Sequence, residues 1–127
     1  MKYGLLIFVI VLLGCANDNL TTQVTLEGKW VEINTNTDTL TFGLLGGQEA
    51  VILSRDKEMR DGFLLPKSGS GSYDYKLLTD QISLRWHLSS NSAFTDYYIK
   101  QTGNRMEIEN FYSTTAIGTI QTFEKLK

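Results

Sequence analysis

The sequence predicts an all-β fold, an eight-stranded antiparallel up-and-down barrel, and three observations support this prediction. Six phenylalanines, six tyrosines and two tryptophans, with only one proline, suit the pleated and half-buried surface of a β-sheet. Short segments of alternating apolar and polar residues recur along the chain, and turn-forming residues separate them. No segment after residue 25 repeats its apolar residues with the period of a helix.

The expected strands are short and follow one another closely. They cover residues 28–34, 39–43, 49–54, 72–77, 82–88, 94–101, 105–112 and 117–126. Eight strands are enough to close a small barrel, and consecutive strands joined by short turns form one without crossovers. A two-sheet β-sandwich built from the same strands is the alternative fold.

Turn formers delimit the first three strands. Asparagines, threonines and an aspartate at residues 34–38 end the first strand. Gly46 and Gly47 supply the positive-φ positions of a tight hairpin between the second and third strands. In the second strand, Leu40 and Phe42 alternate with threonines, so they share the face that we expect to point inward.

Residues 55–71 form the longest segment without a strand pattern. The segment begins with a run of charged residues and ends in a stretch of glycine and serine. We interpret the charge run as a solvated surface loop, and a partner-binding loop is the alternative. A short helical turn across residues 56–60 is compatible with the pattern.

The alternation is clearest in residues 72–88, which predict a half-buried hairpin with its turn at residues 79–80. Its apolar positions are Tyr73, Tyr75, Leu77, Ile82, Leu84, Trp86 and Leu88. Three further turns separate the remaining strands. The inward face of the final strand stays open, because Ile120 and Leu126 lie on one side of it and Ile117 and Phe123 lie on the other.

The N-terminus has the features of an export signal. A positive charge at Lys2 is followed by an apolar run over residues 3–13, which is much shorter than the ~20 residues of a transmembrane helix. Residues 12–15 read Leu-Leu-Gly-Cys and closely resemble the lipobox of bacterial lipoproteins. The resemblance implies that residues 1–14 are a cleaved signal peptide and that the Cys15 thiol carries a diacylglycerol, with fatty acids such as palmitate. The alternative is that Cys15 is a small buried residue in an ordinary signal.

Residues 15–25 comprise the lipidated cysteine and a polar tether with too little apolar surface to fold. By resemblance to the sorting rules of lipoproteins, Ala16 beside the cysteine argues against retention in the inner membrane. We therefore expect a lipid anchor in the outer membrane of a Gram-negative cell envelope. Whether the protein faces the periplasm or the cell surface is left open.

The remaining residues, 26–127, are enough for one domain with one core. The formal net charge is -2, and acidic and basic residues are interspersed, so no basic face for nucleic acid is expected. Cys15 is the only cysteine, which excludes a disulfide within the chain. We expect a monomer.

The start of the first strand carries a family resemblance. Gly28 and Trp30, separated by Lys29, resemble the G-x-W signature of the lipocalins. In that family the tryptophan closes one end of the barrel and an arginine stacks on it, a role for which Lys125 is the candidate here. The chain is similar to compact lipocalin-like lipoproteins of Gram-negative bacteria. This resemblance implies a lipocalin-like β-barrel and a binding function.

Patterns for catalysis and metal binding are not found in the sequence. His87 is the only histidine, and no cysteine pair is present, so we expect neither a metal site nor a cofactor. His87 alternates with Trp86 on a strand and is expected to face the solvent, which argues against a Ser-His-Asp site. We therefore expect that the protein is not an enzyme.

Two functions are compatible with these observations. The leading expectation is a membrane-anchored binding module that holds a small apolar or amphipathic ligand in its open end. Its lining would be drawn from Trp30, Phe42, Tyr75, Trp86 and Tyr98, although the same aromatics can instead fill the core of so short a barrel. The alternative is a non-catalytic interaction or scaffold component of an envelope complex, in which residues 55–71 touch a partner protein.

Overall fold

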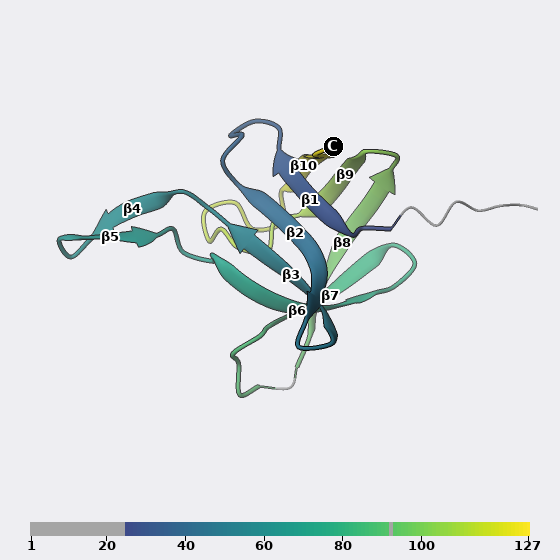
Figure 1. Cartoon of the computed structure of the whole chain (residues 1–127), viewed down its shortest axis with the longest axis horizontal. Coiled ribbons are helices and arrows are strands. Elements are labelled where there is room, and N and C mark those ends of the chain that lie inside the picture. Colours follow the sequence, from purple (N-terminus) through teal and green to yellow (C-terminus); the bar gives the residue numbers. More distant parts are fainter. Residues whose placement is uncertain (1–24, 92) are drawn as a thin grey trace, which may run out of the picture.

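The computed structural model describes residues 25–91 and 93–127. The described residues form ten strands: β1 Gly28–Glu32, β2 Thr39–Leu45, β3 Gln48–Ser54, β4 Lys57–Arg60, β5 Phe63–Pro66, β6 Gly71–Leu77, β7 Gln81–Trp86, β8 Thr95–Thr102, β9 Arg105–Glu109 and β10 Ile120–Lys125. Eight of them close an antiparallel barrel in the order β1-β10-β9-β8-β7-β6-β3-β2 (Figure 1). The predicted eight-stranded barrel is confirmed, and the sandwich alternative is wrong.

Each barrel strand overlaps one predicted segment, and the turns use the expected residues. Gly46 and Gly47 have φ values of 59° and 82°, as a tight hairpin between β2 and β3 requires. The predicted signal peptide at residues 1–14, the predicted lipidation site Cys15 and all of the predicted tether except Thr25 lie outside the described residues. Within the described ranges, no helix is long and apolar enough to cross a bilayer.

The segment between β3 and β6, which shows no strand pattern in the sequence, forms a hairpin, so the helical turn that the sequence allowed across residues 56–60 is wrong. Strands β4 and β5 pair with each other alone, with Met59 opposite Leu64. Between them, Asp61 and Gly62 have φ values of 51° and 84°. Asp-Gly favours a two-residue hairpin turn, and this local preference overrides the charge pattern. We call residues 57–66 the arm, which projects away from the barrel (Figure 1).

Strands β1 and β10 close the barrel, with Trp30 directly opposite Lys125. The Trp30 side chain is fully buried, and its Nε1 donates a hydrogen bond of 2.7 Å to the Leu26 carbonyl. The Lys125 ammonium lies 5.4 Å from the centre of the Trp30 ring and donates to the Thr25 carbonyl at 3.3 Å. Lys125 therefore stacks on the tryptophan, as expected for this position.

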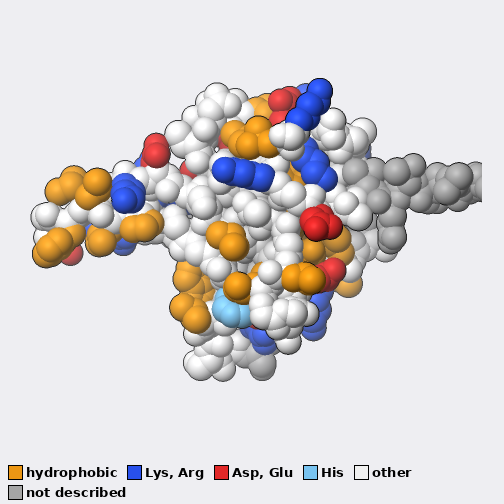
Figure 2. Space-filling view, in the orientation of Figure 1, with side chains coloured by type: hydrophobic (Ala, Val, Ile, Leu, Met, Phe, Trp, Pro, Cys, Tyr) orange, Lys and Arg blue, Asp and Glu red, His pale blue; other side chains and the backbone are white. Residues whose placement is uncertain are grey.

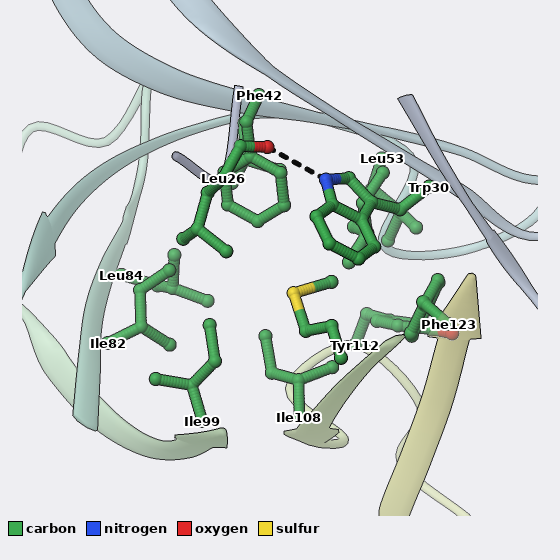
Figure 3. Close-up of a cluster of buried hydrophobic side chains, with 13 residues drawn as sticks. Leu26, Trp30, Phe42, Leu53, Ile82, Leu84, Ile99, Ile108, Tyr112 and Phe123 are labelled. Atoms are coloured by element: carbon green, nitrogen blue, oxygen red, sulfur yellow. Dashed lines mark hydrogen bonds between the residues drawn. The ribbon is translucent and has the colours of Figure 1, made fainter. Parts of the chain in front are cut away.

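One hydrophobic core fills the middle of the barrel, where side chains from facing strands point toward one another (Figure 3). Leu40 and Phe42 belong to it, which confirms their predicted inward face. Phe123 is fully buried, so it defines the inward face of β10, whereas Ile117 precedes that strand and is exposed. The thirteen buried members are Leu26, Trp30, Leu40, Phe42, Val51, Leu53, Ile82, Leu84, Ile99, Met106, Ile108, Tyr112 and Phe123.

The two ends of the barrel differ in construction. At the end that we call the mouth, β1 begins, β10 ends, and the β2–β3, β6–β7 and β8–β9 turns come together. At the opposite end, which we call the capped end, lie the β1–β2 loop, the arm and the β7–β8 and β9–β10 connections.

Candidate functional site

The five aromatic residues expected to line a ligand site do not lie together. Trp30 and Phe42 are in the core, with exposed fractions of 0 % and 2 %. Neither side chain reaches the surface. Each can therefore contribute to a surface site only by packing beneath the residues that line it. For these two residues, the structure shows the core-filling role that the sequence left open.

Tyr75 lies at the mouth, and its ring packs edge-on against Phe42 with centroids 5.4 Å apart. It lines a pocket of about 390 Å³, which we call the mouth pocket. The lining residues are Thr25, Leu26, Glu27, Gly43, Leu44, Glu49, Tyr75 and Leu77. Tyr75 is therefore the one predicted ligand residue that joins the barrel core to an open pocket.

The apolar lining of the mouth pocket faces inward but is left uncovered. Leu44 lies two residues beyond buried Phe42 on β2, and Leu77 lies two residues beyond Tyr75 on β6, so both point to the inner face. Yet Leu44 is 75 % exposed and Leu77 is 49 % exposed. Inward-facing leucines that remain exposed mark the place where the barrel interior opens to solvent.

A second pocket of about 570 Å³ lies beside the mouth pocket and shares Leu26 and Leu77 with it. It is lined by the β6–β7 turn and by β8, including Tyr98. Tyr98 alternates with buried Ile99 and is half exposed, so it points to the outside of the barrel. This residue therefore lines a groove on the rim and not the barrel interior.

Trp86 lies at the capped end, away from the other predicted ligand residues. Its ring contacts Tyr73 edge-on at 4.9 Å, and Tyr73 contacts Phe111 in the same way at 5.1 Å. A Cβ atom on Gly71 would lie 2.5 Å from Cη2 of Trp86, so only glycine fits beneath this ring. Burial raises the pKa of Tyr73 to about 12. These aromatics pack on one another and close the capped end.

A buried polar cluster completes the closure of the capped end. The Asp38 carboxylate lies 3.4 Å from Nε of Arg55 and accepts a hydrogen bond of 3.1 Å from the Tyr112 hydroxyl. The Arg55 guanidinium lies over the Tyr112 ring at 4.8 Å and donates to the Ser68 carbonyl at 2.6 Å. Burial raises the pKa of the Tyr112 phenol, and the negative charge of Asp38 raises it further. The cluster ties three connections together.

Glu32 is a second buried carboxylate at this end. Burial alone would raise its pKa, but hydrogen bonds from Thr35 and Asn34 together lower it. The backbone N–H groups of these two residues donate to its Oε2 at 2.6 Å and 3.1 Å. The carboxylate therefore organises the β1–β2 loop and is not free for proton transfer.

Charge at the mouth pocket is negative. Burial raises the pKa of the Tyr75 phenol, and the charges of Glu49 and Glu27 raise it further. Both carboxylates therefore act on the same hydroxyl, although they come from β3 and from the segment before β1. The mouth pocket combines an apolar floor with two anionic groups at its rim.

His87 lies on the outer surface, as expected, but it is paired. Its Nδ1 is 2.6 Å from Oδ1 of Asp74, and Nη2 of Arg85 donates to Oδ2 of the same carboxylate at 2.7 Å. The single histidine is visible at the surface in Figure 2. Hydrogen bonding from His87 and then from Arg85 lowers the pKa of Asp74. Asp74 on β6 and Arg85 on β7 thus form a cross-strand ion pair, and the same Asp74 carboxylate holds the imidazole of His87 just after β7.

The arm carries an unusual number of exposed apolar side chains (Figure 2). Met59, Phe63 and Leu64 are all more than half exposed, and Leu65 is partly so. Two of its charged residues pair with each other, with Nε of Arg60 3.3 Å from Oε1 of Glu58. The arm is thus an apolar projection that the barrel does not cover.

Sequence reasoning missed the most informative residues of the mouth pocket, namely Leu44, Leu77, Glu27 and Glu49. Alternation from Phe42 and Tyr75 does place both leucines on the inner face. The two glutamates carried no such signal, because their approach depends on the register of β1 with β2 and of β2 with β3, which the sequence pattern does not specify. In residues 25–91 and 93–127, no group of three or more histidines, cysteines, aspartates or glutamates is placed to hold a metal ion.

A scan against protein-family models finds no match, and neither the curated proteins nor the solved structures contain a significant match to this chain.

Proposed function

We propose that the chain is a lipocalin-like lipoprotein of the outer membrane that binds a small apolar or amphipathic molecule at its mouth. The observation that carries this proposal is the mouth pocket, where inward-facing Leu44 and Leu77 stay exposed beside Tyr75. Apolar surface in a concave site gains free energy when a ligand removes it from water. The proposed role is binding and not catalysis, and the pairing of the single histidine, His87, with Asp74 on the outside of the barrel supports this proposal.

Three features support the lipocalin likeness. The barrel is closed, antiparallel and eight-stranded, and its strands follow sequence order apart from the inserted arm. Trp30 is buried at the start of β1, and Lys125 stacks on it from β10. Glycine is needed at position 28, the first residue of the G-x-W pattern, because a Cβ there would lie 3.0 Å from Cε of Lys125. The glycine, the tryptophan and the stacking cation thus form one unit.

The filled core limits the kind of ligand. Trp30, Phe42 and Phe123 occupy the space that a deep calyx would offer. A ligand can therefore cover the mouth and rest on Leu26 and Tyr75, but it does not traverse the barrel. We expect a ligand with a short apolar part.

Binding can be tested with the soluble chain from Asn19 to Lys127, which contains every strand and every core residue described. We expect calorimetric titration with fatty acids, short-chain alcohols, haem and lipids to identify at least one binder. Leu44→Asn should weaken its binding, because a polar group replaces apolar pocket lining. Leu88→Asn is the matched control, since Leu88 is 82 % exposed near the capped end. Equal losses in both variants, or no binder at all, would remove the proposal.

The anchor can be tested separately on the full chain. Only a thiol accepts the diacylglycerol, so Cys15→Ser should migrate as the uncleaved precursor and incorporate no labelled palmitate. The unaltered chain should incorporate the label and stay with membranes after a salt wash. Release of the unaltered chain by salt would contradict the proposed localisation.

The arm favours a second candidate function, which is contact with a partner protein of the envelope. On one face of the hairpin, Met59 and Leu64 are directly opposite each other and both exposed. A partner with an apolar groove would bury this pair. Insertion of the arm tip into a bilayer is disfavoured by Asp61, because a carboxylate at the turn would enter the lipid first.

A photo-crosslinking amino acid placed at Phe63 tests this second function in intact cells. We expect one discrete crosslinked product, and we expect Leu64→Ser to abolish it. The same crosslinker at Ile117, which is 76 % exposed on the β9–β10 connection, is the control and should give no such product. Identical products from both positions would show only non-specific contact with exposed apolar residues.

A further inference from the structure

We infer that the mouth pocket selects a cationic amphiphile, a short apolar chain that ends in an ammonium group. This inference rests on the proposed ligand-binding function and specifies the chemical class of the ligand. It depends on the charge at the rim of the mouth pocket and on the apolar character of its floor.

The floor accounts for the apolar part of the ligand. Leu26 from the segment before β1, Leu44 from β2 and Leu77 from β6 line the pocket with aliphatic side chains, together with the Tyr75 ring. Leu26 is held in place, because its carbonyl accepts the hydrogen bond from Trp30 and its side chain is buried. An alkyl chain can lie across this surface without entering the filled core.

The rim accounts for the head group. Glu27 and Glu49 are the two charged residues that line the mouth pocket. Both belong to the end of the barrel where Gly28 pairs with Phe42 and Leu44 pairs with Glu49, and both line the same pocket as Tyr75. In agreement with this placement, both contribute to the raised pKa of the Tyr75 hydroxyl. An ammonium group between them gains two attractive interactions, and the adjacent ring of Tyr75 can add a cation–π contact.

The neighbouring cation does not reverse this charge. The Lys125 ammonium is not among the groups that line the pocket; it lies over the Trp30 ring and donates to the Thr25 carbonyl. Both contacts hold it at the seam where Trp30 and Lys125 are paired. A carboxylate, sulfate or phosphate head at the rim would therefore meet two glutamates and no lining cation, so anionic lipids and fatty acids are disfavoured.

The experiment compares three probes that share one apolar chain: octyltrimethylammonium, octanol and octyl sulfate. Each is titrated into the soluble chain from Asn19 to Lys127, below its micellar concentration, and binding is followed by calorimetry and by the methyl NMR signals of Leu44 and Leu77. We expect the ammonium probe to bind about tenfold more tightly than octanol, since two partly exposed charge pairs contribute roughly 1.4 kcal/mol. Octyl sulfate should bind more weakly than octanol, and added salt should reduce the differences.

Variants assign the preference to the two carboxylates. The double substitution Glu27→Gln and Glu49→Gln should make the ammonium probe and octanol bind alike, without weakening octanol itself. Glu124→Gln removes one exposed charge on the outer face of β10 and should leave the preference intact. Circular dichroism of each variant shows that it is folded.

The outcomes separate the two levels of the proposal. If octanol binds as well as the ammonium probe, or octyl sulfate binds best, the inference about the head group is wrong and the proposed binding function stands. If the preference survives the double substitution, the assignment to Glu27 and Glu49 is wrong. If none of the three probes shifts the Leu44 and Leu77 signals, both the inference and the mouth as ligand site are wrong.

Discussion

At Gly28, the absence of a Cβ atom leaves room for the Lys125 side chain at the seam between β1 and β10. Its φ of 115° lies in a region that other residues rarely adopt, and a Cβ would lie 3.0 Å from Cε of Lys125. We predict that Gly28→Ala lowers the free energy of unfolding by about 1–3 kcal/mol through backbone strain and displacement of Lys125. Urea unfolding measures the change. Gly43→Ala is the matched control within β2, because nothing lies within 4 Å of its Cβ position.

At the capped end, the hydrogen bond between Tyr112 and Asp38 is a second contact of single residues that should affect stability. The Tyr112 hydroxyl donates to a carboxylate that is only 5 % exposed. Tyr112→Phe removes this donor while keeping the ring, so we expect a loss of about 1–2 kcal/mol in urea unfolding. Tyr98→Phe alters a half-exposed phenol on the outer surface and should change stability little. A similar loss in both variants would contradict the role given to the Asp38 contact.

Strands β6 and β7 are joined by an ion pair that should make stability depend on pH. Hydrogen bonds from His87 and Arg85 lower the pKa of Asp74 in the folded state. This stabilisation is present above the ordinary aspartate pKa of about 3.9 and is lost as the pH falls through the lower folded value. We predict that Asp74→Asn flattens the decrease in stability on acidification, as measured by urea unfolding at a series of pH values. Glu124→Gln should keep the slope of the original chain.

The arm is the element that adds least to the barrel. The Lys67 N–H donates to the Asp56 carbonyl at 2.9 Å, so the two ends of the arm are adjacent. Joining Asp56 to Lys67 through an Asn-Gly turn should therefore close a direct β3–β6 hairpin. We expect the free energy of unfolding to change by less than about 1 kcal/mol, because the arm contributes no side chain to the core. A large drop in the melting temperature would show that the arm supports the fold.

At the scale of the whole molecule, closure between β1 and β10 should control stability. Phe123 is fully buried in the closing strand and lies opposite Glu32 of β1. We predict that Phe123→Ala costs about 3–5 kcal/mol, since it leaves a cavity at the seam. Ile120→Ala, in the same strand but at a half-exposed position, should cost much less in the same denaturant titration. Comparable costs would mean that burial at the seam is not what matters.

The barrel could be predicted because alternation is a local signal. Leu40 and Phe42 are separated by threonines, and their shared inward face follows from that spacing alone. Strand β8 shows the limit of the same signal, because Tyr97 and Tyr98 are adjacent and either could face inward. The arm was missed because its Asp-Gly turn lies among charged residues that suggested a solvated loop.

The candidate site could be predicted only in part. The alternation on β6 predicts Tyr75, but it does not predict Glu27 and Glu49, which reach the same pocket through the register of β1, β2 and β3. Trp86 was placed on the inner face of a strand, yet its strand position puts it at the capped end. Alternation predicts whether a side chain points to the inside or the outside of the barrel. Its height along the barrel axis depends on register and on strand tilt.

The pairing of β1 with β10 also sets an order of events as the chain emerges on the far side of the inner membrane, as the proposed export requires. Strand β1 is the first barrel strand to emerge, and its second hydrogen-bonded neighbour, β10, is the last. Until then, β1 keeps one unpaired edge, and Trp30 lacks its cover from Lys125. When seven of the eight barrel strands have emerged, the sheet therefore exposes two unpaired strand edges at once. For such a chain, the interval between the seventh strand and the eighth is the period in which a chaperone has most to protect.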